Sequence, residues 1–221
     1  LLVEMWYAWG LVLEGGVTAQ LFHWMLGLLL AGGAVLLARP VLGTDWSWMV
    51  GAVVLLIPGV TNQMTAPLND VALAAMTTLA LVAWRAAQQQ HEAGEPRHDG
   101  EPHRHGMHYA LAGLLLGAAL STKYVALVFA LAVAVVWGYD LYRQPIRRAE
   151  RLRGAAITFG VAVCVAGVWY LRAWWLRGNP VYPFLTGVST ADGVAHMTAA
   201  DKTPLGMSLW SLISAPWLVT F

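Results

Sequence analysis

Charged residues are scarce in this chain of 221 amino acids. Asp, Glu, Lys and Arg together make up 11% of it, whereas soluble domains carry about 25%. Hydrophobic residues make up 58%, and the mean hydropathy is +0.58. This composition excludes an ordinary soluble domain and indicates an integral membrane protein. The net charge of +1 gives no indication of nucleic-acid binding, and no nucleic-acid partner is expected.

Cysteine is almost absent, since Cys164 is the only one. A single cysteine excludes an intramolecular disulfide and a cysteine-based metal site, and its place in an apolar run suits a small core side chain. The sequence begins at Leu1 without a methionine and stops at Phe221 within an apolar stretch. We therefore expect it to be a fragment of a larger polytopic protein.

Apolar stretches follow one another along the chain. They predict an all-α, polytopic transmembrane bundle of about six or seven membrane segments, with a full helical crossing needing about 20 residues. Residues 1–221 are expected to form part of one transmembrane domain. Leu1–Leu13 is either the tail of a crossing helix or an interfacial helix with Trp6, Tyr7 and Trp9 at headgroup level. The clearest further segments are residues 18–38, 46–60, 71–84, 109–139 and 154–173.

The longest apolar run, Tyr109–Tyr139, contains a single charge, Lys123. As one helix it would be about 46 Å long, against a hydrocarbon core of about 30 Å. The tetrapeptide Ser121–Tyr124 divides it into two short halves, which favours a compact helical hairpin with Lys123 at its tip. The alternative is one long tilted helix whose lysine reaches an interface. A charge at membrane depth is costly, so Lys123 is a functional candidate.

The long hydrophilic insert, residues 85–108, holds five of the seven histidines. His103, His105 and His108 would suit loose binding of a transition metal. However, no cysteine accompanies them, and the Gly/Pro/Glu-rich composition does not preorganise a site. A flexible, solvated loop is therefore favoured, and no metal-binding residues are predicted.

Arginine placement predicts the orientation in the membrane. If Arg39, residues 85–108 and Asp140–Arg153 are cytoplasmic, nine of the thirteen Lys and Arg residues lie inside, as the positive-inside rule requires. The hairpin then enters and returns from the cytoplasm, and residues 174–221 lie mainly outside. Asp70, Lys123 and Arg172 are all placed on, or directed toward, the outer side.

A lysine and an arginine near the outer leaflet suit the phosphate of a lipid head group, because Lys offers a point charge and Arg a bidentate fork. Arg172 and Asp70 also have a simpler interpretation. Arg172 would anchor the chain at the interface beside tryptophans, and Asp70 would complement the dipole at a helix start. Gly113 and Gly117 predict close packing of the two hairpin arms.

Three further polar residues carry weaker signals. His23 lies in an apolar helix and is interpreted as a hydrogen-bonded core residue rather than a ligand. Glu4 and His196 are candidates for a site, although nothing in their spacing supports them.

Three motifs occur in an order that resembles a known family: Ala66–Leu73 (APLNDVAL), Gly113–Tyr124 (GLLLGAALSTKY) and Trp169–Phe184 (WYLRAWWLRGNPVYPF). The chain is similar to bacterial membrane glycosyltransferases of the GT-C superfamily, the group that contains protein O-mannosyltransferases and aminoarabinose transferases. It departs from the pattern at Ala173, where family members commonly have Asn.

The resemblance implies a polyprenyl-phosphate-linked sugar as donor, transfer on the outer side, and a multi-pass protein of the bacterial inner membrane. It puts Lys123 near the donor phosphate. With Arg172 as the second cationic group, Asn69, Asp70 and Tyr124 are the candidates that line the site. In such enzymes an acid in the first outer loop serves as base or metal ligand.

That loop is expected to precede Leu1, so the catalytic residue is expected upstream, and a divalent metal cofactor is left open. The preferred function is inverting sugar transfer, in which a base deprotonates the acceptor hydroxyl and cationic groups stabilise the leaving phosphate. One alternative is a transporter or flippase of lipid-linked or anionic solutes, with Lys123 and Asp70 lining its path. The other is a non-catalytic membrane assembly subunit.

Overall fold

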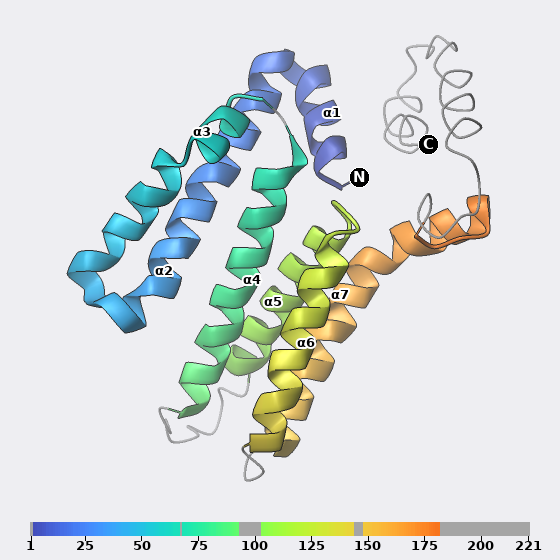
Figure 1. Cartoon of the computed structure of the whole chain (residues 1–221). Coiled ribbons are helices and arrows are strands. Elements are labelled where there is room, and N and C mark those ends of the chain that lie inside the picture. Colours follow the sequence, from blue (N-terminus) through green and yellow to red (C-terminus); the bar gives the residue numbers. More distant parts are fainter. Residues whose placement is uncertain (1, 67, 93–102, 144–147, 182–221) are drawn as a thin grey trace. The chain divides into compact units, whose positions relative to one another are not determined.

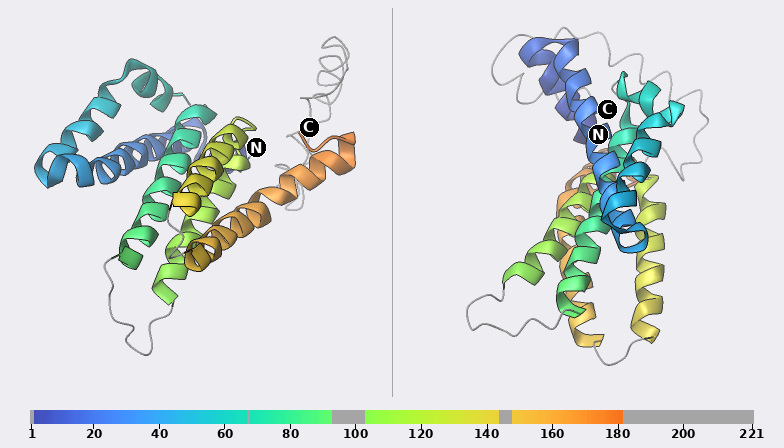
Figure 2. Two further views of the ribbon diagram at one scale, coloured as in Figure 1. Left: turned by 60° about the horizontal axis from the view of Figure 1, so that its bottom comes forward. Right: turned by 90° about the vertical axis from the view of Figure 1, so that its left-hand side faces the viewer.

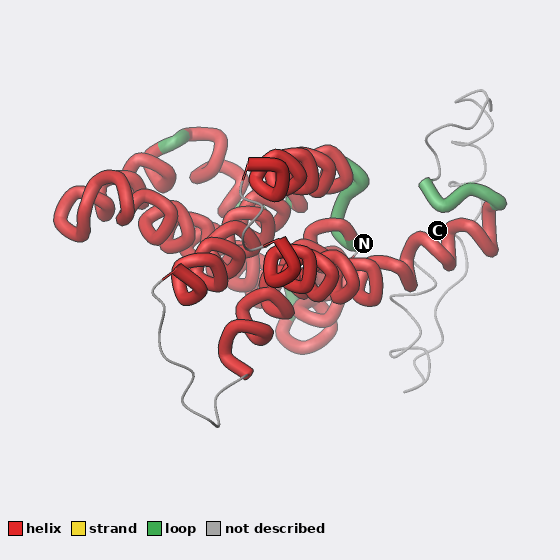
Figure 3. Tube along the Cα trace, turned by 90° about the horizontal axis from the view of Figure 1, so that it is seen from below, coloured by secondary structure: helices red, strands yellow, loops and turns green. Residues whose placement is uncertain are grey.

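The computed structural model describes residues 2–66, 68–92, 103–143 and 148–181, and its regular elements there are all α-helices (Figures 1 and 3). Four of them, α2, α4, α6 and α7, are long and apolar enough to cross a membrane. The prediction of an all-α integral membrane protein is confirmed. The helices are α1 (Leu2–Glu14), α2 (Gly16–Leu56), α3 (Pro58–Met64), α4 (Asn69–Glu92), α5 (His103–Leu120), α6 (Ala126–Arg143) and α7 (Arg148–Arg177).

Helix α2 consists of two antiparallel arms, residues 16–42 and 44–56, joined at the bend in Figure 1. Gly43 forms this bend with φ 74° and ψ 176°, a conformation that glycine adopts without steric cost. The arms pack closely, since a Cβ on Gly51 would lie 2.7 Å from Val35 Cγ2 and 3.3 Å from the Ala31 carbonyl oxygen. The predicted segment 18–38 lies in the first arm. The predicted segment 46–60 covers the second arm and the start of α3, because α2 ends at Leu56.

The run 109–139 is a helical hairpin, as predicted, because α5 ends at Leu120 and α6 begins at Ala126. The last carbonyls of α5 are satisfied locally. Ser121 Oγ donates to the Gly117 carbonyl (2.7 Å), and Thr122 Oγ1 donates to the Ala118 carbonyl (2.8 Å). Helix α4 packs along both arms of the hairpin, and Figure 2 shows the three helices side by side.

The prediction that Gly113 and Gly117 pack the two hairpin arms together is wrong. A Cβ on Gly113 would meet the Thr158 carbonyl oxygen, and a Cβ on Gly117 would lie 2.9 Å from the Ala162 carbonyl oxygen, so both glycines face α7. Thr158 Oγ1 also donates to the Tyr109 carbonyl (3.1 Å). The small residues allow the backbones of α5 and α7 to approach closely.

The helices extend into the predicted loop of residues 85–108, since α4 continues to Glu92 and α5 begins at His103. The predicted loop is therefore too long at both ends. The Ala- and Gln-rich stretch after Arg85 has high helix propensity, which explains the extension of α4. Residues 93–102 lie outside the described residues, so flexibility there stays a prediction. Within the described ranges, no group of three or more His, Cys, Asp or Glu could hold a metal ion.

Arginines gather at one end of the helices, beside the bend of α2 and the end of α6. The Arg39 guanidinium lies 5.9 Å from the centre of the Trp48 ring, and that of Arg143 lies 5.1 Å from the centre of the Tyr139 ring. Arg85 of α4 donates to the Leu37 carbonyl (3.5 Å). Arginines beside aromatic rings are typical of a membrane interface.

The chain divides into two units, Leu2–Trp169 and the part that starts at Tyr170 with the last turns of α7. The first unit contains α1 to α6 and most of α7. It holds the residues that form the candidate site described next.

Candidate functional site

The centre of the candidate site is an ion pair between Lys123 in the hairpin turn and Asp70 in the first turn of α4, in which Lys123 Nζ donates to Asp70 Oδ1. The two side chains are 38% and 52% exposed. The dipole of α4 favours the position of Asp70, because this acid lies at the positive start of that helix. The sequence predicted both residues for the same side, and the structure brings them into contact.

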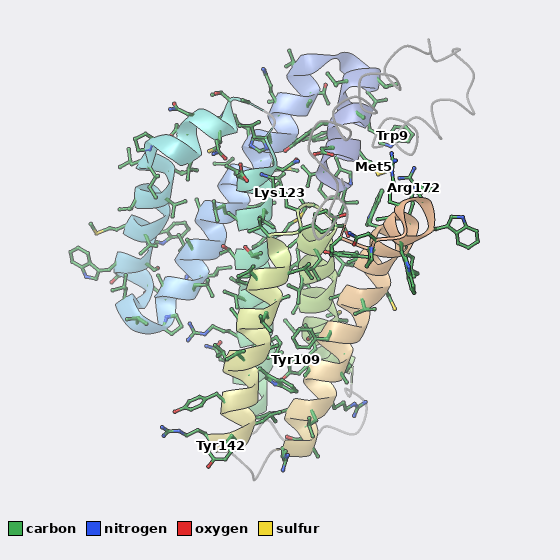
Figure 4. The ribbon with its side chains drawn as sticks, turned by 45° about the vertical axis from the view of Figure 1, so that its right-hand side comes forward. Met5, Trp9, Tyr109, Lys123, Tyr142 and Arg172 are labelled. Atoms are coloured by element: carbon green, nitrogen blue, oxygen red, sulfur yellow. The ribbon has the colours of Figure 1, made fainter. Side chains whose placement is uncertain are left out.

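Helix α1 lies at this end of the unit. Figure 4 shows Lys123 at the end where Met5 and Trp9 of α1 lie, far from Tyr142 at the other end. The Leu2 amide donates to the Ser121 carbonyl in the hairpin turn (3.0 Å). Asn69 Nδ2 donates to Glu4 Oε1 (2.6 Å). The start of α1 therefore contacts both elements that carry the ion pair.

The ion pair adds little to stability, because exposed pairs contribute about 0.2–1 kcal/mol. An ammonium group has three N–H donors, so Lys123 can bind a further anion while it is paired with Asp70. Tyr124 follows Lys123 and is partly buried. Burial raises the pKa of the Tyr124 phenol. A phenol is protonated at neutral pH in any case, so Tyr124 can donate a hydrogen bond.

Arg172 lies near the end of α7 in the second unit, and its joint action with Lys123 on one phosphate stays a prediction. After Arg177 the helix is closed by Gly178, which has φ 67° and donates its amide to the Trp174 carbonyl (2.7 Å). This is a left-handed helix cap. Residues 182–221, including the candidate His196, lie outside the described residues.

Tyr7 and His23 are polar residues near the site that the sequence did not bring together. Tyr7 was grouped with Trp6 and Trp9 at headgroup level, but it is 6% exposed and forms a hydrogen bond with His23 Nδ1. Trp6 and Trp9 are 43% and 44% exposed. His23 is a fully buried core residue, as interpreted, and its Nδ1 is hydrogen-bonded to Tyr7. Its Nε2 has no hydrogen-bond partner among the described residues, so only one of its two ring nitrogens is satisfied.

The comparison with known families assigns the chain to one of them. Residues 13–182 match the family model of dolichyl-phosphate-mannose-protein mannosyltransferases. The chain belongs to this family. The match runs from the last two residues of α1 to beyond the end of α7 and includes Asn69, Asp70, Lys123 and Arg172. No curated protein and no solved structure matches the chain.

Membership of this mannosyltransferase family confirms the resemblance to GT-C glycosyltransferases. It identifies the chain as a membrane glycosyltransferase of a family that uses lipid-linked sugar donors. The membrane-spanning helices are consistent with such a donor, because its lipid tail is held in the bilayer.

Proposed function

We propose that this protein transfers a sugar from a polyprenyl-phosphate donor to an acceptor on the outer side of the bacterial inner membrane. The observation that carries the proposal is the Lys123–Asp70 pair at the hairpin turn. It lies at the opposite end of the helices from Arg39, Arg85 and Arg143. By the positive-inside rule the arginine end is cytoplasmic, so the pair is on the outer side.

In the proposed reaction, Lys123 binds the donor phosphate and stabilises the negative charge that develops on it as the bond from the sugar carbon to the phosphate oxygen breaks. The acceptor hydroxyl oxygen forms the new bond to that carbon from the opposite face. Its proton goes to a base. Polyprenyl phosphate leaves.

Asp70 orients the Lys123 ammonium, and Asn69 and Tyr124 line the site where the donor phosphate binds. The family match favours sugar transfer over a transporter or an assembly subunit.

The test is a transfer assay on the full-length protein in membranes with a radiolabelled polyprenyl-phosphate sugar. Lys123→Ala is expected to lower the rate about 100-fold or more, as is typical when a group that stabilises developing charge is removed. Arg143→Ala, which also removes an exposed cation but at the other end, is expected to leave the rate unchanged. Wild-type transfer by Lys123→Ala at equal protein level would contradict the phosphate role.

A further inference from the structure

A buried polar pair lies between α1 and α2, next to the candidate site. Tyr7 on α1 is 6% exposed, and His23 on the first arm of α2 is fully buried. The Tyr7 hydroxyl is hydrogen-bonded to His23 Nδ1, and the two rings meet edge to face with their centres 5.6 Å apart. Tyr7 belongs to the apolar cluster that includes Val71 and Ala119. Val71 directly follows Asp70 in α4, and the Ala119 carbonyl accepts a hydrogen bond from the Lys123 amide (3.3 Å).

Tyr7 also reaches the segment that precedes α4. Its hydroxyl lies 3.4 Å from the Leu68 carbonyl oxygen, and Leu68 directly precedes Asn69 and Asp70. A phenol has one hydrogen to donate and also accepts hydrogen bonds. It can therefore accept from His23 and donate to Leu68, and this arrangement joins α1, α2 and the start of α4.

A second side chain of α1 holds the next residue of that segment. Glu4 accepts a hydrogen bond from Asn69 Nδ2 (2.6 Å). Glu4 and Tyr7 are spaced i and i+3, so they lie on the same face of α1. Helix α1 therefore contacts Leu68 through Tyr7 and Asn69 through Glu4, while its first amide is bonded to the Ser121 carbonyl in the hairpin turn.

An apolar pair would fill the space of Tyr7 and His23 without the cost of burying polar groups. Hydrogen bonds add directionality, because they fix the place of a particular backbone carbonyl. Here that carbonyl belongs to the residue before Asn69–Asp70. We propose that Tyr7 and His23 are positioning residues for the lipid-linked donor, which hold Leu68 and thereby keep Asp70 and Lys123 where the donor phosphate binds. The inference rests on the proposed phosphate role of Lys123.

The test measures equilibrium binding of radiolabelled polyprenyl-phosphate mannose to the full-length protein in lipid nanodiscs. Tyr7→Phe keeps the ring and removes the hydroxyl, and it is expected to raise Kd about 5-fold, the effect of one buried hydrogen bond. Tyr142→Phe is the matched control, because Tyr142 is 86% exposed at the other end, and its Kd is expected to be that of the wild type. Lys123→Met is expected to raise Kd more than Tyr7→Phe does.

A positioning role predicts that the effects are not additive. The double variant Tyr7→Phe/Lys123→Met is expected to have the Kd of Lys123→Met alone, because the misplaced lysine is already gone. His23→Gln keeps a hydrogen-bonding side chain for Tyr7, so it is expected to bind more tightly than His23→Leu. Partial unfolding would lower the number of binding sites without changing Kd, which separates a folding defect from a positioning defect.

Each contrary result has a distinct meaning. Suppose that Lys123→Met binds the donor weakly. The positioning role alone is then overturned if Tyr7→Phe has the wild-type Kd, or if the Kd of the double variant is raised by the product of the two single-variant factors. A wild-type Kd for Lys123→Met overturns the phosphate role and this inference together.

Discussion

At the residue scale, a single substitution tests whether Asp70 serves the proposed reaction or only the stability of the fold. Asp70→Asn keeps the shape of the side chain and removes the charge that holds Lys123. We expect transfer to fall about 10-fold, as when one charge-assisted hydrogen bond is lost. The melting temperature is expected to stay within a few degrees, because the exposed pair contributes about 0.2–1 kcal/mol. Initial rates with radiolabelled donor and thermal melting check both points.

Asp45→Asn serves as the control for Asp70→Asn. Asp45 is an exposed acid beside the bend of α2, at the arginine end of the unit. Its substitution is expected to leave transfer unchanged. If Asp70→Asn strongly lowered the melting temperature and left the rate at the wild-type level, the pair would be structural and its functional interpretation wrong.

Glu4 offers a second prediction at the residue scale. Its bond with Asn69 needs an acceptor oxygen and no charge, and a glutamine side chain also supplies an oxygen. Glu4→Gln is therefore expected to keep donor binding within about 2-fold, whereas Glu4→Ala loses the hydrogen bond and binds about 5-fold more weakly. Binding of the radiolabelled donor measures both. An equal loss in the two variants would show that the negative charge of Glu4 itself is needed.

Single residues also show where sequence reasoning succeeds. Lys123 was identified because an isolated charge in an apolar run stands out, and Asp70 because it is an acid at a helix start. Tyr7 was misplaced and its bond to His23 was missed, since the sequence of a short, apolar helix does not show which face meets a partner. Trp6, Tyr7 and Trp9 all suit an interface, but α1 turns only Tyr7 inward.

At the element scale, the contact of α5 with α7 gives a stability prediction. Gly117→Ala would bring a Cβ to 2.7 Å from Val165 Cβ and 2.9 Å from the Ala162 carbonyl oxygen. Overpacking of this kind typically costs about 1–3 kcal/mol, so the melting temperature of the purified protein is expected to fall by several degrees. Thermal melting in detergent checks the prediction.

Gly138→Ala is the matched control, because a Cβ there has no neighbour within 4 Å among the described residues. It is expected to be neutral or to stabilise α6, since alanine favours a helix interior over glycine by about 1 kcal/mol. If the two variants melted alike, the close approach of α5 to α7 would be wrong.

Elements differ in how far a sequence predicts them. Segment length and the Ser121–Tyr124 break were enough to predict the hairpin, because the bilayer thickness limits a single helix. The partner of Gly113 and Gly117 was predicted wrongly, since a stripe of small residues indicates a close contact and not the helix that makes it. The turn between the predicted segments 18–38 and 46–60 is made at one glycine with positive φ, Gly43.

At the scale of the whole molecule, the proposed function depends on which side of the membrane the Lys123–Asp70 pair faces. The chain has one cysteine, Cys164. The expectation of a core position for it is wrong, because Cys164 is exposed. A Cys164→Ser background therefore accepts single reporter cysteines. Thr65→Cys lies just before α4, at the end of the helices that carries the Lys123–Asp70 pair. Tyr142→Cys lies at the opposite end, where the arginines gather. Both positions are exposed.

A membrane-impermeant maleimide added to intact spheroplasts is expected to label Thr65→Cys and to label Tyr142→Cys only after lysis. The reason is the charge asymmetry between the two ends, because arginine-rich segments stay on the cytoplasmic side during insertion. The unsubstituted Cys164→Ser protein is the control for background labelling. The reverse pattern would place Lys123 and Asp70 in the cytoplasm. It would leave their contact intact but exclude transfer to an acceptor on the outer side, since a lipid-linked donor reacts on the side where its phosphate is bound.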